Sequence, residues 1–267
     1  MFSTFFVRVL TAAVYGTVFL VAILFGRPLG LGIVLALLAA LASAEFYGIT
    51  RREHRQPNEV FGMLAATAMP VAAAVWGLPG VTSVVTVLLV AAIGWHVVFR
   101  TVTTSDTAIT LFGAVYIGFA LAHFVLIREL DAGTELALAT IVSIWANDVF
   151  AYLLGSATGR HKMAPKISPN KSWEGFAAGT LGTIVVWGVA GSLIGAGPSI
   201  LWYLVIGVAL SLAAVVGDLA ESRLKREAGV KDSGRALPGH GGFLDRIDSL
   251  LLASVVAYYL LVWAGAR

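Results

Sequence analysis

The chain has 267 residues, of which 58% are hydrophobic and only 12% are charged, and its formal net charge is +3. A soluble domain carries about 25% charged residues, so this composition is typical of a membrane protein. The small net charge gives no reason to expect a nucleic acid as a partner. The chain contains no cysteine, which excludes disulfides, zinc–thiolate sites and thiol nucleophiles.

Apolar runs recur along the chain, each close to the roughly 20 residues that a helix needs to cross a bilayer. They are continuous and do not alternate apolar with polar residues, which favours helices over a membrane barrel. We therefore expect an all-α, polytopic membrane protein with about nine transmembrane helices. The expected spans lie at about 9–26, 29–49, 60–77, 81–99, 108–127, 136–158, 175–195, 200–221 and 249–265.

Two of these boundaries need comment. The first run follows a single basic residue, Arg8, and lacks a convincing small-residue cleavage site, so we expect a retained helix rather than a signal peptide. The third and fourth spans are separated only by the sequence GLPG, which makes this boundary the least distinct.

Lysine and arginine gather in the loops after even-numbered spans, whereas the connecting loops after odd-numbered spans hold only Arg27 and Arg128. By the positive-inside rule, we expect the N-terminus and the basic loops in the cytoplasm and the C-terminus outside, in a cell (inner) membrane. The positive charge of Arg51, Arg52 and Arg55 is sufficiently explained by the positive-inside rule and by contact with anionic lipid headgroups.

Two of the basic loops differ from the rest. Residues 160–175, RHKMAPKISPNKSWEG, combine four cations with two prolines. Residues 221–248 are dense in both signs of charge and include several glycines. Membrane topology requires neither the carboxylates nor the glycines, so we expect these loops to carry chemistry.

Four carboxylates lie in or beside the apolar spans. Asp218 is near the cytoplasmic end of the eighth span and Asp148 lies within the sixth. Asp245 and Asp248 begin the ninth span, and their i, i+3 spacing places them on one helical face. A charge in the bilayer costs several kcal/mol unless it is paired, solvated or bound to a metal. Hard oxygen ligands without sulfur predict Mg²⁺ or a similar cation.

A simpler alternative is that these carboxylates are structural. They could pair with nearby cations, namely Arg223, Lys225 or Arg246. Asp245 and Asp248 would also be favourable at the N-terminus of a helix for electrostatic reasons alone.

The glycines and cations of residues 221–248 suggest an anion site. Glycines in the run PGHGGFLDRID allow backbone N–H groups to approach an anion, and the following helix offers its positive end. These glycines are Gly239, Gly241 and Gly242. Charge for several phosphates is supplied by Lys225, Arg226, Lys231 and Arg235. Metal carboxylates, cations and exposed N–H groups together indicate phosphoryl or nucleotidyl transfer. A phosphate nucleophile needs no base at neutral pH, so we expect His240 to contact phosphate or hold the loop.

Three stretches also resemble a known family. Ser222 to Arg226, the pair Lys231–Asp232, and the run LPGHGGFLDRID, which contains Arg246, resemble the signature of phosphatidate cytidylyltransferases, also called CDP-diacylglycerol synthases. SPNKSWEG at 168–175 is similar to the family's second characteristic loop, and NDVFAY resembles its polar sixth span, except that Asn147 stands where a small residue is usual. The resemblance covers roughly 145–250.

The resemblance implies that CTP and phosphatidic acid react to give CDP-diacylglycerol and pyrophosphate. It also implies a homodimer, and Mg²⁺ accompanied by a monovalent cation such as K⁺. Because one substrate is a membrane lipid and the other a cytosolic nucleotide, the active site is expected at the cytoplasmic membrane boundary. We accordingly divide the chain into N-terminal transmembrane helices, 1–130, and a C-terminal catalytic transmembrane region, 131–267.

Residue roles follow from this resemblance together with the charges. Metal is expected on Asp218, Asp245 and Asp248, with Asp148 as an additional ligand or a neighbour of the ligands. Catalytic and triphosphate contacts are expected from Lys225 and Arg226, and further substrate contacts from Lys166, Lys171, Ser222, Lys231, Asp232, Gly239, His240, Gly241, Gly242 and Arg246. Ser172 is a candidate for reading the cytosine base.

Two other classes of protein agree less well with the sequence. A membrane anion transporter would be expected to show repeated halves with polar sites at mid-bilayer, and neither is evident. A CDP-alcohol phosphotransferase would carry the pattern D-x-x-D-G-x-x-A-R, which this chain lacks.

Overall fold

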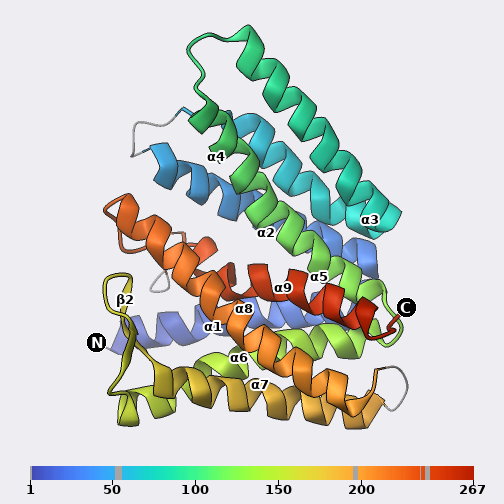
Figure 1. Ribbon diagram of the computed structural model, residues 1–267, viewed down its shortest axis with the longest axis vertical. Coiled ribbons are helices and arrows are strands. Elements are labelled where there is room, and N and C mark those ends of the chain that lie inside the picture. The colour runs from blue at the N-terminus through green and yellow to red at the C-terminus, as the bar shows by residue number, and fades with distance from the viewer. Residues whose placement is uncertain (1, 52–55, 195–197, 235, 238–240) are drawn as a thin grey trace. The chain divides into compact units, whose positions relative to one another are not determined.

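The computed structural model describes residues 2–51, 56–194, 198–234, 236–237 and 241–267, with side chains from residue 13 onward (Figure 1). Helices dominate the chain, which confirms the expected fold class. The helices are α1 (Phe2–Phe25), α2 (Pro28–Thr50), α3 (Glu59–Val98), α4 (Thr104–Ala114), the π-helix η2 (Val115–Phe119), α5 (Ala120–Glu129), α6 (Gly133–Thr158), α7 (Trp173–Ile194), α8 (Ile200–Glu227) and α9 (Leu244–Trp263). One small sheet is formed by β1 (Lys162–Ala164) and β2 (Ser168–Ser172).

Seven helical segments in the described part of the chain are long and apolar enough to cross a membrane. One of them is the continuous run Thr104–Glu129, which comprises α4, η2 and α5. The multi-pass character expected from the sequence is therefore confirmed, whereas the count of nine differs for two reasons. The part of α1 with described side chains, Ala13–Phe25, is apolar but shorter, and α3 is a single assigned helix where two spans were expected.

Helix α3 is bent at the boundary that the sequence marks as GLPG. Gly77 adopts φ 63° and ψ −153°, a conformation that residues with a Cβ avoid, and Pro79 follows it. Residues from both sides of the bend, including Leu64 and Val87, line one apolar groove, so the two arms lie side by side (Figure 1). A straight helix of 40 residues would be about 60 Å long, roughly twice the thickness of the hydrocarbon layer, which explains why the chain folds back.

The chain forms two compact units that do not follow the sequence order. The first unit comprises Met1–Leu126 and Leu224–Ile247, and the second comprises Ile127–Arg223 and Asp248–Arg267. Helices α8 and α9 each contribute residues to both units. The division at 130/131 was made on function rather than on contacts, and it stays a prediction.

Within the second unit, α6 and α7 pack closely through small residues. A Cβ added at Gly175 would lie 2.9 Å from the carbonyl oxygen of Ala151, and one at Gly179 would lie 2.6 Å from Oδ1 of Asn147. Small residues spaced by four allow two helix backbones to approach in this way. The packing brings the start of α7 against the middle of α6, where Asn147 and Asp148 lie.

Candidate active site

The basic loop 160–175 forms an antiparallel hairpin in the second unit. Lys162 pairs with Ser172 and Ala164 pairs with Ser168. The open end is closed by Glu174, whose carboxylate accepts hydrogen bonds from the backbone N–H and the Nδ1 of His161, at 3.2 and 2.6 Å. The hairpin carries Lys171 on β2. The cations and prolines of this loop set it apart in the sequence, but its strands were not predicted.

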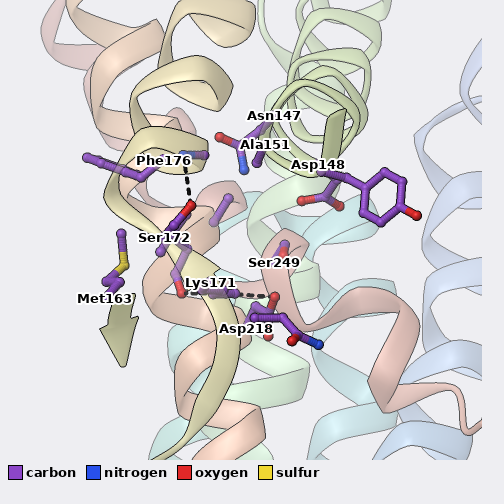
Figure 2. Close-up of a pocket in the computed structure, with 14 residues that line it drawn as sticks. Asn147, Asp148, Ala151, Met163, Lys171, Ser172, Phe176, Asp218 and Ser249 are labelled. Carbon is purple, nitrogen blue, oxygen red and sulfur yellow. Dashed lines mark hydrogen bonds and ion pairs between the residues drawn. The ribbon is translucent and has the colours of Figure 1, made fainter. Parts of the chain in front are cut away.

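A cavity of about 290 Å³ lies beside the hairpin in the second unit. Figure 2 shows its polar side chains converging from different elements, with Asp148 on α6, Lys171 on β2 and Asp218 on α8. Its lining is formed by Asn147, Asp148, Ala151, Tyr152, Met163, Asn170, Lys171, Ser172, Gly175, Phe176, Ala214, Val215, Asp218 and Ser249. A cavity whose walls are mostly apolar and carry a few convergent polar groups is typical of a small-ligand site.

Lys171 and Asp218 form an ion pair at the wall of this cavity. The Lys171 Nζ lies 2.7 Å from Asp218 Oδ2, and the Ser222 hydroxyl donates to Oδ1 of the same carboxylate at 3.2 Å. The structure thus brings together three residues that the sequence predicted for the site. The partner of Asp218 is Lys171, from a distant part of the chain, rather than one of the neighbouring cations considered as a structural alternative.

The other predicted carboxylates of the second unit are Asp148 and Asp248. Asp148 lines the cavity together with Asp218. Asp248 accepts a hydrogen bond from the N–H of Ser249 at 2.7 Å, and its backbone packs against Gly217, which leaves no room for a Cβ there. The start of α9 therefore crosses α8 one residue before Asp218.

The donor set of the cavity fits a hard divalent cation that arrives with phosphates. No group of three His, Asp or Glu side chains that could hold a metal occurs among the described residues. Mg²⁺ is usually held by one or two carboxylates together with substrate phosphates and water, not by a cage of protein ligands. Two carboxylates, Asp148 and Asp218, face one cavity and meet this requirement.

Buried neutral polar groups complete the cavity wall. Asn147 is 2% exposed, and its Oδ1 accepts from the Ser211 hydroxyl at 2.8 Å, which in turn lies 2.8 Å from the Thr180 hydroxyl. Ser172 accepts from the N–H of Gly175 at 3.2 Å and so caps the start of α7. In the sequence, Asn147 stood out only as a departure from the family pattern. Its position as a polar residue within an apolar span could have identified Asn147 as a candidate site residue.

In the first unit, Asp245 is the centre of a second cluster. Its Oδ1 lies 2.6 Å from the Nζ of Lys225, and these side chains are only 6% and 12% exposed. Its Oδ2 accepts from the N–H and the hydroxyl of Ser233, both at 2.9 Å, and from the N–H of Gly242 at 2.7 Å. Lys225, predicted to bind the triphosphate, is thus the ion-pair partner of Asp245 in this structure.

Glu45 joins this cluster and was missed by the sequence analysis. Its carboxylate accepts from the N–H groups of Phe243 and Leu244, at 3.0 and 2.9 Å, and from the Ser233 hydroxyl at 2.9 Å. The signal that could have found it is a lone carboxylate in the apolar run 29–49.

The remaining predicted residues fall into three groups. Gly239 and His240 lie outside the described residues, as do Arg52, Arg55 and Arg235. Exposed side chains are found at Lys166, Arg226, Lys231, Asp232 and Arg246. Gly241 has φ +81° and so occupies a conformation that favours glycine, while the N–H of Gly242 is directed to Asp245. Roles for these residues in substrate binding stay predictions.

Comparison with known proteins gives consistent results. Residues 6–264 match the family described as "Cytidylyltransferase family". The chain is 40% identical to a phosphatidate cytidylyltransferase of Bacillus subtilis over 163 residues, 61% of each chain, and 40% identical to one of Staphylococcus epidermidis over 157 residues, 59% of this chain and 60% of that one. A phosphatidate cytidylyltransferase of Pseudomonas aeruginosa is 34% identical over 220 residues, 78% of this chain and 80% of the relative.

These matches differ in how much of each chain they cover. For the Bacillus and Staphylococcus relatives, the match spans about three fifths of their length. The family match, by contrast, leaves out only a few residues at either end of this chain. The resemblance noted in the sequence is therefore confirmed, and the chain belongs to the cytidylyltransferase family.

Proposed function

We propose that this protein is a phosphatidate cytidylyltransferase, which joins the cytidylyl group of CTP to phosphatidic acid and releases pyrophosphate. The family match and the names of the relatives support this reaction. The observation that carries the proposal is the cavity lined by Asp148 and by the Lys171–Asp218 pair. Carboxylates and a lysine directed into one cavity are suited to a phosphate-bearing ligand.

The chemistry requires positioning and charge stabilisation rather than a general base. An ionised phosphate oxygen of phosphatidic acid attacks the α-phosphorus of CTP. The bond from that phosphorus to the bridging oxygen of the β-phosphate breaks, and its electron pair leaves with pyrophosphate. Lys171, which lines the cavity, would stabilise negative charge on the phosphate oxygens there.

Asp218 and Asp148 would hold a divalent cation such as Mg²⁺, with Asp245 and Asp248 as further predicted ligands and a monovalent cation such as K⁺ alongside. When bound, the cation would supply positive charge next to the attacked and leaving phosphate oxygens. The Lys171 ion pair and the Ser222 hydrogen bond orient the Asp218 carboxylate for this role.

Further contacts to the triphosphate come from cations of the two loops. In this proposal Lys225, Arg226, Lys231 and Lys166 bind phosphate oxygens, and the glycine run 239–242 with His240 lies beside them. Ser222, Asp232 and Arg246 contact substrate as members of the family signature. Base recognition is assigned to neutral groups, with Ser172 as the candidate.

We place the reaction at the cytoplasmic boundary of a cell (inner) membrane. The chain would cross the bilayer nine times if the two arms of α3 and the whole of α1 are counted, with the N-terminus inside and the C-terminus outside. The protein would act as a homodimer embedded among membrane lipids. The basic loops after even-numbered spans support this orientation.

The test is an assay of the purified protein in mixed micelles of detergent and phosphatidic acid. Pyrophosphate release from CTP should require both phosphatidic acid and a divalent cation, and it should match the amount of CDP-diacylglycerol formed. Release of pyrophosphate without phosphatidic acid, or equal lipid product from ATP and CTP, would contradict the proposal.

A further inference from the structure

Glu45 is a carboxylate in the apolar helix α2, one of the segments able to cross a membrane. Such a charge is costly unless it is bonded. Among the described residues, the donors that reach it are the Ser233 hydroxyl and the N–H groups of Phe243 and Leu244, which lie before the start of α9 or at it. A helix start leaves backbone N–H groups without partners inside the helix, and Glu45 accepts from those of Phe243 and Leu244.

The glycines of this segment make room for carboxylates. A Cβ at Gly234 or at Gly242 would collide with the carboxylate of Glu45. At Gly241, which has a positive φ, a Cβ would meet Oδ2 of Asp245. At these positions, glycine therefore lets two carboxylates approach the backbone.

Glu45 and Asp245 hold the same turn. The hydroxyl of Ser233 lies 2.9 Å from Oε2 of Glu45 and 2.9 Å from Oδ2 of Asp245. The N–H of Gly242 is directed to Asp245, while the next two N–H groups along the chain are directed to Glu45. Loss of Glu45 would leave the N–H groups of Phe243 and Leu244 without their acceptor, and would leave the Ser233 hydroxyl to Asp245 alone.

We propose that Glu45 is a positioning residue, which orients Asp245 by fixing the turn that precedes α9. This role rests on the proposed cytidylyltransferase function, in which Asp245 takes part in catalysis. Glu45 itself touches neither substrate, since its carboxylate is occupied by the donors of the turn. It acts through Ser233 and the backbone of 242–244.

The test compares Glu45→Ala and Glu45→Gln with a matched control, Glu59→Gln. Glu59 also belongs to the first unit and is paired with Arg51, away from the turn. We expect Glu45→Ala to lower kcat by about 10- to 100-fold, as is typical when a group that orients a catalytic ligand is removed. The KM for CTP should change much less than kcat. Glu45→Gln, which retains one acceptor oxygen, should be intermediate, and Glu59→Gln should keep the wild-type kcat.

A double-mutant cycle separates positioning from a purely structural role. If Glu45 acts through Asp245, then Glu45→Ala should cost little further activity in an Asp245→Asn background. Losses that multiply in the double variant would overturn the proposal. So would a wild-type kcat in both Glu45 variants.

Hydrogen exchange provides a readout that does not depend on activity. In the protein without nucleotide, the amides of 242–244 should exchange faster in Glu45→Ala than in wild type, while those of α3 stay unchanged. Unchanged exchange at 242–244 would overturn the role of Glu45, as would faster exchange throughout the first unit. Ser233→Ala, which leaves α2 intact, should give a smaller change at the same amides. If wild-type protein forms no CDP-diacylglycerol, the proposed function fails, but the exchange result still tests Glu45.

Discussion

At the scale of single residues, each of two aspartates is paired with one lysine. Asp218 is paired with Lys171 at 2.7 Å in the second unit, and Asp245 with Lys225 at 2.6 Å in the first. Removing one member of a poorly solvated pair leaves the other charge uncompensated, which costs more than the pair itself contributes. A phosphate ligand can replace the carboxylate as the partner of such a lysine, because both are oxygen anions. In the proposed function, a phosphate of the substrate would take the place of Asp218 or Asp245 as the partner of Lys171 or Lys225.

We expect Asp218→Asn to lower kcat for CTP by about 10²-fold or more, because the amide retains the shape of the side chain but loses the charge that pairs with Lys171 and that would hold the metal of the proposed function. Pyrophosphate release in mixed micelles measures this loss. Asp131→Asn, in the exposed connection before α6, is the matched control. An Asp218→Asn protein that elutes as wild type from size exclusion and keeps the wild-type kcat would remove Asp218 from the site.

Lys171→Ala should raise the KM for CTP by about tenfold or more, since a hydrogen bond to a charged group contributes about 1.5–3 kcal/mol. Lys162→Ala, on the facing strand β1 and outside the cavity lining, should change it much less. The measurement is initial rate against CTP concentration at saturating phosphatidic acid. Equal KM values for wild type and Lys171→Ala would show that the basic loop serves membrane topology alone.

Some of these site residues could be predicted from the sequence, whereas their partners could not. Asp218 and Lys171 were identified because a carboxylate in an apolar span and a lysine in a proline-rich loop are visible in the sequence. Their pairing was not, because it joins positions far apart in the chain. Glu45 and the acceptor role of Asn147 were missed for the same reason, since their partners are set by tertiary packing. The predicted metal ligands remain predictions.

At the scale of elements, the close contact of α6 and α7 decides where the cavity lies. The start of α7 can approach α6 because glycines lie at the contact, and the hairpin between the two helices is thereby held where its Lys171 lines the cavity together with Asp148 of α6. Expected span boundaries agreed with the helices to within a few residues at most ends, because length and hydrophobicity fix them. The hairpin was not predicted, since its strands are short and contain a proline. The fold-back at Gly77 was marked only as a weak boundary.

Gly179→Ala should destabilise the protein, whereas Gly188→Ala in the same helix should be neutral or stabilising. Alanine is favoured over glycine in a helix by about 1 kcal/mol at either position. At Gly179 the new Cβ would lie 2.6 Å from Oδ1 of Asn147, but at Gly188 its nearest neighbour would be a Leu204 methyl group at 3.5 Å. Thermal unfolding in detergent measures the difference, and a Tm for Gly179→Ala at or above that of Gly188→Ala would contradict the packing argument.

At the scale of the whole molecule, the protein combines an apolar body with charged loops that carry the candidate chemistry. The composition indicated a membrane protein, and the loop motifs indicated the cytidylyltransferase family. The match to the family over residues 6–264 then confirmed that assignment. What the sequence pattern could not reveal was that α8 and α9 each contribute to both compact units, because that depends on how distant segments pack. Cations bind the triphosphate of any nucleotide, so selection among nucleotides must come from other groups.

ATP and GTP should therefore compete weakly with CTP without forming a lipid product, and dCTP, which has the same base, should be accepted. A site with buried donors and acceptors rejects a wrong base because its polar groups are left unpaired. The measurement is lipid-product formation from each nucleotide at matched Mg²⁺, with inhibition constants against CTP. Absence of any competition by ATP would indicate that the base, and not the triphosphate, dominates binding.

The crowding of Glu45 by Gly234 and Gly242 also constrains how this sequence can change over evolutionary time. A larger residue at either glycine would force the glutamate at position 45 to shift, and at Gly242 it would also displace the Ser233 hydroxyl, so the cost of each substitution depends on which came before it. A shorter residue at position 45 would lower the cost of a larger residue at position 234 or 242, and a return to glutamate would then become costlier until the glycine was restored. Positions 45, 234 and 242 should therefore vary together among relatives, because their side chains compete for the same space although position 45 is far from the other two in the sequence.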